Sequence, residues 1–229
     1  MFQKLYPLLL QLFYPKLCFA CQVHLTKKEQ SICATCRYQL VPTNFHNKAK
    51  NPVLDRFWGR VNLEHATTAF VFTKKGLLQQ LIHQLKYDSQ PQIAYELGKI
   101  YGKVIRHVSP YKQVDTIVPV PLHPKKQHIR GYNQAEKFAE GLAESMGINY
   151  NTDWLIRTEN TSTQTQKSRL ERFKNVQSAF KLTTTAPTSA NILLVDDVIT
   201  TGATLEACCG VLLALKNYKV SIAAIALTT

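Results

Sequence analysis

Apolar residues along the chain follow two alternating spacings, and these predict most of the secondary structure. Runs of β-branched and other apolar residues, typical of buried strands, occur at 66–73, 116–120, 191–195 and 220–227. Between them, apolar residues recur at helical spacing and predict helices over 77–87, 93–108, 133–146 and 202–215. Strands that alternate with helices predict an α/β fold, with a mainly parallel sheet and helices on both faces.

Composition divides the chain into three regions. Residues 1–45 hold an apolar start and four cysteines, 46–65 are polar and irregular, and 66–229 carry the alternating pattern. We therefore expect a small N-terminal module, a linker and an α/β domain. The apolar stretch at 1–13 is too short to cross a bilayer and is interrupted by Pro7, so it predicts an amphipathic helix. A peripheral membrane contact is the alternative.

The strand predicted at 191–195 runs directly into a group of polar residues. Asp196 and Asp197 follow it, and then Thr200, Thr201, Gly202, Ala203 and Thr204 open a helix. Backbone N–H groups at a helix start bind phosphate, and glycine lets the backbone approach a ligand closely. Carboxylates repel phosphate but accept hydrogen bonds from a sugar diol. The pattern predicts a ribose 5-phosphate site, and the alternative is a solvated turn before an ordinary helix cap.

A second loop follows the strand at 116–120. Pro121, Leu122 and His123 are succeeded by basic residues that include Arg130. Backbone donors and cationic side chains of this kind suit a pyrophosphate group. An ordinary basic surface turn is the alternative.

A third polar stretch runs from Arg157 to Phe180 and is rich in hydroxyl and basic residues. Such a segment can be a mobile lid that orders over an anionic substrate and excludes water. The alternative is a disordered surface loop with no ligand.

Two CxxC pairs, Cys18–Cys21 and Cys33–Cys36, lie eleven residues apart. Four thiolates in this spacing suit a structural Zn²⁺ ion, which would supply folding energy to a segment with little core. An iron site or two disulfides is the alternative. Cys208 and Cys209 fall in an apolar helix and are predicted core residues. This use of cysteine indicates a reducing, cytoplasmic environment.

Charge narrows the range of partners. The chain has 28 Lys and Arg residues against 15 Asp and Glu, a formal net charge of +13. A strongly basic surface favours nucleic acid, phosphorylated small molecules or anionic membranes. A surface that merely keeps the protein in solution is the alternative.

The segment ILLVDDVITTGAT, at 192–204, looks like the phosphoribosyl pyrophosphate (PRPP) signature of type I phosphoribosyltransferases. Taken with the paired CxxC motifs, Leu85-Lys86-Tyr87, VPVPLHP, RGYNQAE and the polar stretch, it resembles the ComF family. These phosphoribosyltransferase-like proteins are linked to natural competence in bacteria. The match covers nearly the whole chain.

The resemblance implies roles for particular residues. Asp196 and Asp197 would hold the ribose hydroxyls, the loop from Thr200 to Thr204 the 5′-phosphate, and Pro121 to His123 with Arg130 the pyrophosphate. Arg157, Gln164, Arg169 and Arg172 would lie on the flexible loop. Mg²⁺ would accompany PRPP.

The resemblance also implies handling of internalised single-stranded DNA during transformation, with other DNA-uptake proteins as possible partners. The location would be cytoplasmic, with peripheral association at the inner membrane as an option. Nothing in the sequence names an acceptor for the ribose. A salvage transferase unrelated to DNA uptake and a non-enzymatic DNA-binding factor therefore stay open as alternatives.

Overall fold

The computed structural model describes residues 15–158, 179–214 and 217–228. The helix predicted at 1–13 and three predicted loop residues, Gln164, Arg169 and Arg172, lie outside the described residues. Within the described part, no helix has the length and apolar character needed to cross a membrane.

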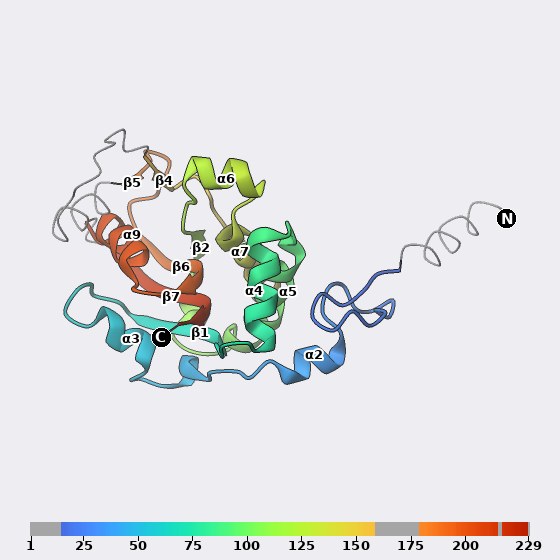
Figure 1. Cartoon of the computed structure of the whole chain (residues 1–229). Helices are drawn as coiled ribbons and strands as arrows, with labels where there is room; N and C mark the ends of the chain where they lie inside the picture. The colour runs from blue at the N-terminus through green and yellow to red at the C-terminus, as the bar shows by residue number, and fades with distance from the viewer. Residues whose placement is uncertain (1–14, 159–178, 215–216, 229) are drawn as a thin grey trace.

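A five-stranded parallel sheet forms the centre of the fold, with the strand order β1-β7-β6-β2-β3 (Figure 1). Its strands are β1 (His65–Val71), β2 (Thr116–Pro119), β3 (Asn149–Tyr150), β6 (Ala190–Ile199) and β7 (Tyr218–Leu227). In the centre of the sheet, Leu193 pairs with Ile117 on one side and with Ser221 on the other. Strand β6 is therefore bonded along both edges as far as Val195, and beyond this residue its pairing with β7 continues to Ile199.

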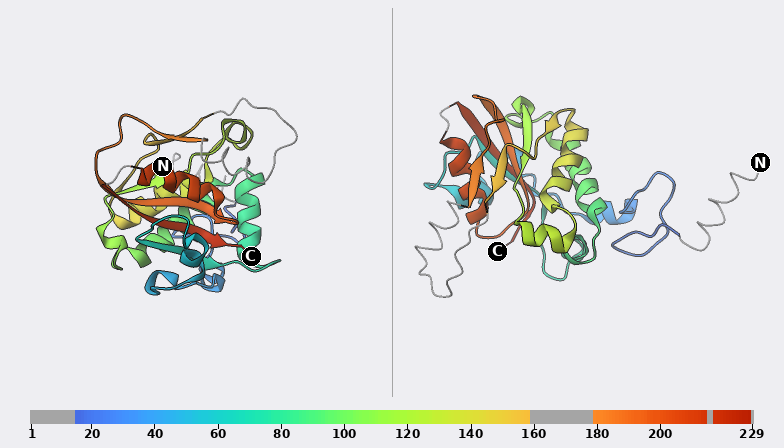
Figure 2. Two further views of the ribbon diagram at one scale, coloured as in Figure 1. Left: turned by 90° about the vertical axis from the view of Figure 1, so that its left-hand side faces the viewer. Right: turned by 90° about the horizontal axis from the view of Figure 1, so that it is seen from above.

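Helices cover both faces of the sheet (Figure 2). One face carries α4 (Leu77–Tyr87), α5 (Pro91–Ile105) and α7 (Gln134–Met146), and the other carries α3 (Pro52–Phe57) and α9 (Ala203–Leu213). Successive side chains of a strand point to opposite faces. Leu193 and Val195 accordingly join the core that includes α4, α5 and α7, whereas Ile192 and Leu194 join the core beneath α9. The predicted fold class, a mainly parallel sheet flanked by helices with a four-cysteine module, is confirmed.

Helices α5 and α7 lie in unusually close contact. A Cβ atom added to Gly141 would lie 2.0 Å from the carbonyl oxygen of Tyr95, and one added to Gly98 would lie 2.4 Å from that of Phe138. Only glycine lets the two backbones approach this closely. The helix pair therefore forms a tightly packed layer between the sheet and solvent.

The structure adds elements that apolar spacing did not predict. Helix α6 (Pro124–Arg130) occupies the basic turn, and α3 lies within the stretch expected to be irregular. The burial of Phe57 in the core shared with α9 stabilises α3 against the sheet. Strands β4 (Leu155–Arg157) and β5 (Phe180–Leu182) form an antiparallel pair on either side of 159–178. The shorter elements are α2 (Ala34–Gln39), η2 (Phe45–Asn47) and η3 (Tyr111–Gln113).

Candidate functional site

The two aspartates lie at the carboxyl end of the central strand, within β6 itself. Oδ1 of Asp196 accepts a hydrogen bond of 2.8 Å from the backbone N–H of Asp197, and Oδ1 of Asp197 accepts one of 2.7 Å from Val198. Burial, and then the adjacent charge of Asp197, raise the pKa of Asp196 well above its usual range. Burial therefore disfavours the ionised form of Asp196.

The predicted phosphate loop follows β6 directly and leads into α9. Gly202, with φ of 81°, adopts the left-handed conformation and caps the helix. Phe57 of α3 packs against Gly202, and the Arg56 guanidinium donates to the carbonyl oxygen of Thr200. Thr200 and Thr201 are exposed. Two exposed threonines thus precede a helix start, an arrangement that suits an anion.

The second predicted loop lies beside the first, because β2 is the neighbour of β6. Pro119 pairs with Val195, and the backbone N–H of Val120 donates to the carbonyl oxygen of Val195 at 2.8 Å. His123 caps α6 by accepting from the N–H of Lys125. The residues proposed for pyrophosphate therefore begin at the same edge of the sheet as the aspartate pair. That adjacency follows from parallel pairing.

The other predicted loop residues occupy different settings. Arg130, at the end of α6, donates to Oε1 of Gln134 at 2.9 Å. Arg157 belongs to β4, where its guanidinium lies 5.3 Å from the centre of the Phe180 ring and burial lowers its pKa. Arg157 is thus the last residue of a paired strand, and it lies before the predicted flexible loop.

Lys86 is a member of the site to which the sequence assigned no role. Its Nζ lies 2.9 Å from Oδ2 of Asp197 and forms an ion pair with it. The only signal in the sequence was its membership of the Leu85-Lys86-Tyr87 motif, which carried the family resemblance but suggested no contact.

The four module cysteines converge. Their sulfur atoms all lie within 4.8 Å of one another, and none is in a disulfide. Thiolates about 2.3 Å from a zinc ion in tetrahedral geometry stand roughly 3.8 Å apart, and Sγ of Cys21 and Sγ of Cys33 are 3.6 Å apart. Backbone N–H groups of Cys33 and Cys36 point at Sγ of Cys18 and Cys33 respectively. The donor set fits a zinc ion, and it favours the metal over the disulfide alternative.

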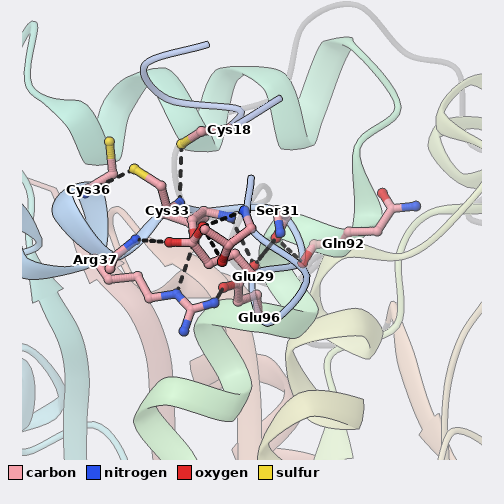
Figure 3. Close-up of polar contacts among 11 residues, drawn as sticks. Cys18, Glu29, Ser31, Cys33, Cys36, Arg37, Gln92 and Glu96 are labelled. Carbon is pink, nitrogen blue, oxygen red and sulfur yellow. Dashed lines mark hydrogen bonds and ion pairs between the residues drawn. The ribbon is translucent and has the colours of Figure 1, made fainter. Parts of the chain in front are cut away.

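One buried carboxylate of the α/β domain accepts several hydrogen bonds from the module (Figure 3). Oε2 of Glu96, in α5, accepts hydrogen bonds from the hydroxyl of Ser31 and from the backbone N–H groups of Ser31 and Ile32, the latter two at 2.8 and 3.1 Å. Arg37 of α2 forms an ion pair with Oε1 of the same side chain. Glu96 is 3 % exposed. These contacts hold the chain immediately before Cys33 against α5.

No protein-family model matches the chain. Among curated proteins it is 27 % identical to competence protein ComFC of Bacillus subtilis over 191 residues, 83 % of this chain and 75 % of that protein. It is 33 % identical to competence protein F of Haemophilus influenzae over 134 residues, 56 % of this chain and 58 % of that protein. It is 31 % identical to the DNA utilization protein YhgH of Escherichia coli K12 over 131 residues, 56 % of this chain and 57 % of that protein. The chain thus spans a little over half the length of most of these relatives.

Solved structures similar to the chain include an adenine phosphoribosyltransferase and a PRPP amidotransferase. Adenine phosphoribosyltransferase of Leishmania tarentolae matches with a TM-score of 0.42 and 12 % identity, over 70 % of this chain and 91 % of that one. Glutamine PRPP amidotransferase of B. subtilis matches with a TM-score of 0.41 and 21 % identity, over 61 % of this chain and 30 % of that one.

The predicted resemblance to ComF proteins is confirmed by the relatives named for competence and DNA use.

Proposed function

We propose that the protein binds PRPP, together with Mg²⁺, at the carboxyl ends of β2 and β6. The observation that carries this proposal is the sequence of groups along one stretch of chain. Asp196 and Asp197 lie at the end of a central buried strand, and the exposed loop from Thr200 leads to a helix start within a few residues. One end suits a diol and the other a phosphate.

The neighbouring residues suit the remaining part of this ligand. The loop from Pro121 to His123 begins beside Val195, and Arg130 ends the helix that follows it. PRPP carries its pyrophosphate on the carbon next to the diol, so a loop beside the aspartates is in a suitable place. Mg²⁺ would bind with the ligand, because pyrophosphate and diol oxygens are hard donors.

Calorimetric titration with PRPP and Mg²⁺ tests the site. The wild type is expected to bind, and the Asp196→Ala/Asp197→Ala variant is expected to lose most of the affinity. Asp153→Ala, an exposed aspartate before β4, is the matched control and should bind normally. Equal affinity in the wild type and the double variant would remove the aspartates from the site.

We further propose that the protein handles internalised single-stranded DNA during transformation. The relatives named for competence and DNA utilization and the net charge of +13 support this role. Trp58 is 82 % exposed directly after Phe57, which packs on Gly202. An exposed aromatic ring on the residue that follows Phe57, which contacts the proposed phosphate loop, suits base stacking.

Binding of a labelled single-stranded oligonucleotide tests the second role. Affinity should fall steeply as salt rises, since phosphate contacts release counterions. Trp58→Ala should weaken binding about tenfold, the loss of one stacked base. Tyr38→Ala removes an aromatic ring that is 92 % exposed on α2 and is the control. Normal binding by Trp58→Ala would place the DNA surface elsewhere.

Transfer of the phosphoribosyl group stays the open enzymatic alternative. Carboxylates and cations around the proposed ligand site support this alternative, because positioning and charge stabilisation supply most of the catalysis in group transfer. Pyrophosphate release from PRPP, measured with and without nucleobases and single-stranded DNA, separates a transferase from a binding protein. Release that requires one of these acceptors would establish the enzyme.

A further inference from the structure

The last turn of α4 brings a cation to the aspartate pair. Nζ of Lys86 lies 2.9 Å from Oδ2 of Asp197, and the two side chains are 24 % and 14 % exposed. The ion pair joins a helix on one face of the sheet to the carboxyl end of its central strand. Because both partners are largely shielded from water, the attraction is stronger than that of a surface pair.

The chain around Lys86 is held in place by the loop between α6 and α7. The hydroxyl of Tyr132 donates to the carbonyl oxygen of Leu85, one residue before Lys86. The side-chain amide of Asn133 donates to the carbonyl oxygen of Val120 at 2.9 Å. This loop therefore ties the end of α4 to the chain that follows β2. The Leu-Lys-Tyr and RGYNQAE motifs, which are far apart in sequence, together position Lys86.

Lys86 also fixes the second carboxylate oxygen of Asp197. One carboxylate oxygen accepts from Val198 and the other pairs with Lys86, so the carboxylate has a fixed orientation. A sugar phosphate carries several negative charges, and two ionised aspartates would repel it. A lysine on one of them reduces that repulsion while leaving oxygen lone pairs free for a diol.

We propose that Lys86 is a positioning residue of the PRPP site, which orients Asp197 and offsets its charge so that an anionic sugar phosphate binds beside two carboxylates. This inference rests on the proposed function. Lys86 acts through Asp197 and not as a direct contact of the pyrophosphate.

Comparing the binding of two ligands distinguishes positioning of Asp197 from direct contact with the pyrophosphate. Ribose 5-phosphate has the diol and the 5-phosphate, whereas PRPP adds the pyrophosphate. Lys86→Gln should weaken both, each in the presence of Mg²⁺, by a similar factor of about ten, which corresponds to about 1.4 kcal/mol. Lys86→Arg should recover most of this affinity. A variant that loses PRPP affinity but binds ribose 5-phosphate normally would overturn the proposal, because Lys86 would then contact pyrophosphate.

The pH dependence gives a readout that a purely structural role would not change. Among the residues that the structure describes, the titratable groups facing Asp197 are Asp196 in the strand, Lys86 in α4 and Tyr132 in the α6–α7 loop, and Cys208 of α9 faces Asp196. Without Lys86, protonation of Asp196, whose pKa is raised, should relieve the repulsion of the ligand as pH falls. The ratio of wild-type to Lys86→Gln affinity should therefore decrease between pH 8 and pH 5. A constant ratio would also overturn the proposal.

Lys99→Gln is the matched control, since Lys99 forms a 2.6 Å ion pair with exposed Glu144 on the surface of α5 and α7. It removes one charge and one ion pair and should leave both affinities unchanged. Failure of the inference is distinguishable from failure of the proposed function. If Lys86→Gln binds normally while Asp196→Ala/Asp197→Ala does not bind, only the proposed role of Lys86 is rejected. If the wild type binds neither ligand, the proposed PRPP site itself is rejected.

Discussion

The carboxylate of Glu96 in α5 accepts the backbone N–H of Ser31 at 2.8 Å, two residues before the third cysteine of the module. The same oxygen also accepts from the Ser31 hydroxyl and the Ile32 backbone, and Arg37 pairs with the other oxygen. One side chain of the α/β domain thus satisfies several polar groups of the module.

Glu96→Ala should lower the free energy of unfolding by about 3 kcal/mol, because it leaves buried N–H groups without acceptors and Arg37 without its partner. Urea denaturation followed by circular dichroism measures this change. Glu144→Gln, an exposed carboxylate on α7, should leave the midpoint nearly unchanged. Equal midpoints for wild type and Glu96→Ala would show that the module contacts contribute nothing to stability.

Removal of metal should unfold the cysteine module and leave the sheet intact. Metal analysis of protein purified without chelator is expected to find one zinc ion per chain. Cys21→Ser should reduce the zinc content and make residues near Cys33 accessible to protease, since metal binding supplies the folding energy of such small modules. Cys209→Ser, outside the module, should keep its zinc. Absence of zinc from the wild-type protein would remove the zinc assignment.

Gly141 should tolerate no side chain. An added Cβ would lie 2.0 Å from the carbonyl oxygen of Tyr95 and would force α5 and α7 apart. Gly141→Ala is expected to lower the free energy of unfolding by about 3 kcal/mol. Gly210→Ala is the control, because nothing lies within 4 Å of its added Cβ on α9, and it should stabilise by about 0.5 kcal/mol. Thermal unfolding of the two variants should shift the midpoint in opposite directions.

Stability should fall as the solution is acidified below neutrality. Burial lowers the pKa of His46, which the charge of His65 lowers further, and burial also lowers the pKa of His65. Nδ1 of His65 lies 2.7 Å from the Tyr111 hydroxyl, and Nδ1 of His46 lies 3.4 Å from that of Tyr101. The unfolded chain takes up protons near pH 6.5, where the folded chain does not, so folding is favoured above that pH.

The urea midpoint is therefore expected to drop as pH falls from 7 toward 5. The loss of stability begins near the pKa of histidine in the unfolded chain and continues until pH reaches the lower pKa values of His46 and His65 in the folded chain. His46→Gln/His65→Gln should flatten this part of the profile. His128→Gln, at an exposed position on α6, should retain it. A double variant with the wild-type slope would assign the acid sensitivity to other groups.

The sequence alone predicted the central strands and main helices, because apolar spacing reflects which faces are buried. Leu77 to Tyr87 is predicted as a helix and found as one, and Gly147 ends α7 in the left-handed conformation that glycine favours. The short elements escaped prediction for a physical reason. Strands β3, β4 and β5 have two or three residues each, too few for a period to show.

The sequence also placed Asp196, Asp197 and the threonine loop at the end of a buried strand, since their chemistry lies in one continuous stretch. Only the tertiary structure brought Lys86 to Asp197, Glu96 to Ser31 and Arg56 to Thr200. These partners are far apart in the chain and meet because strand pairing and helix packing fix where each element ends. Local sequence patterns contain no information on contacts between distant residues, so these contacts were determined by the tertiary structure alone.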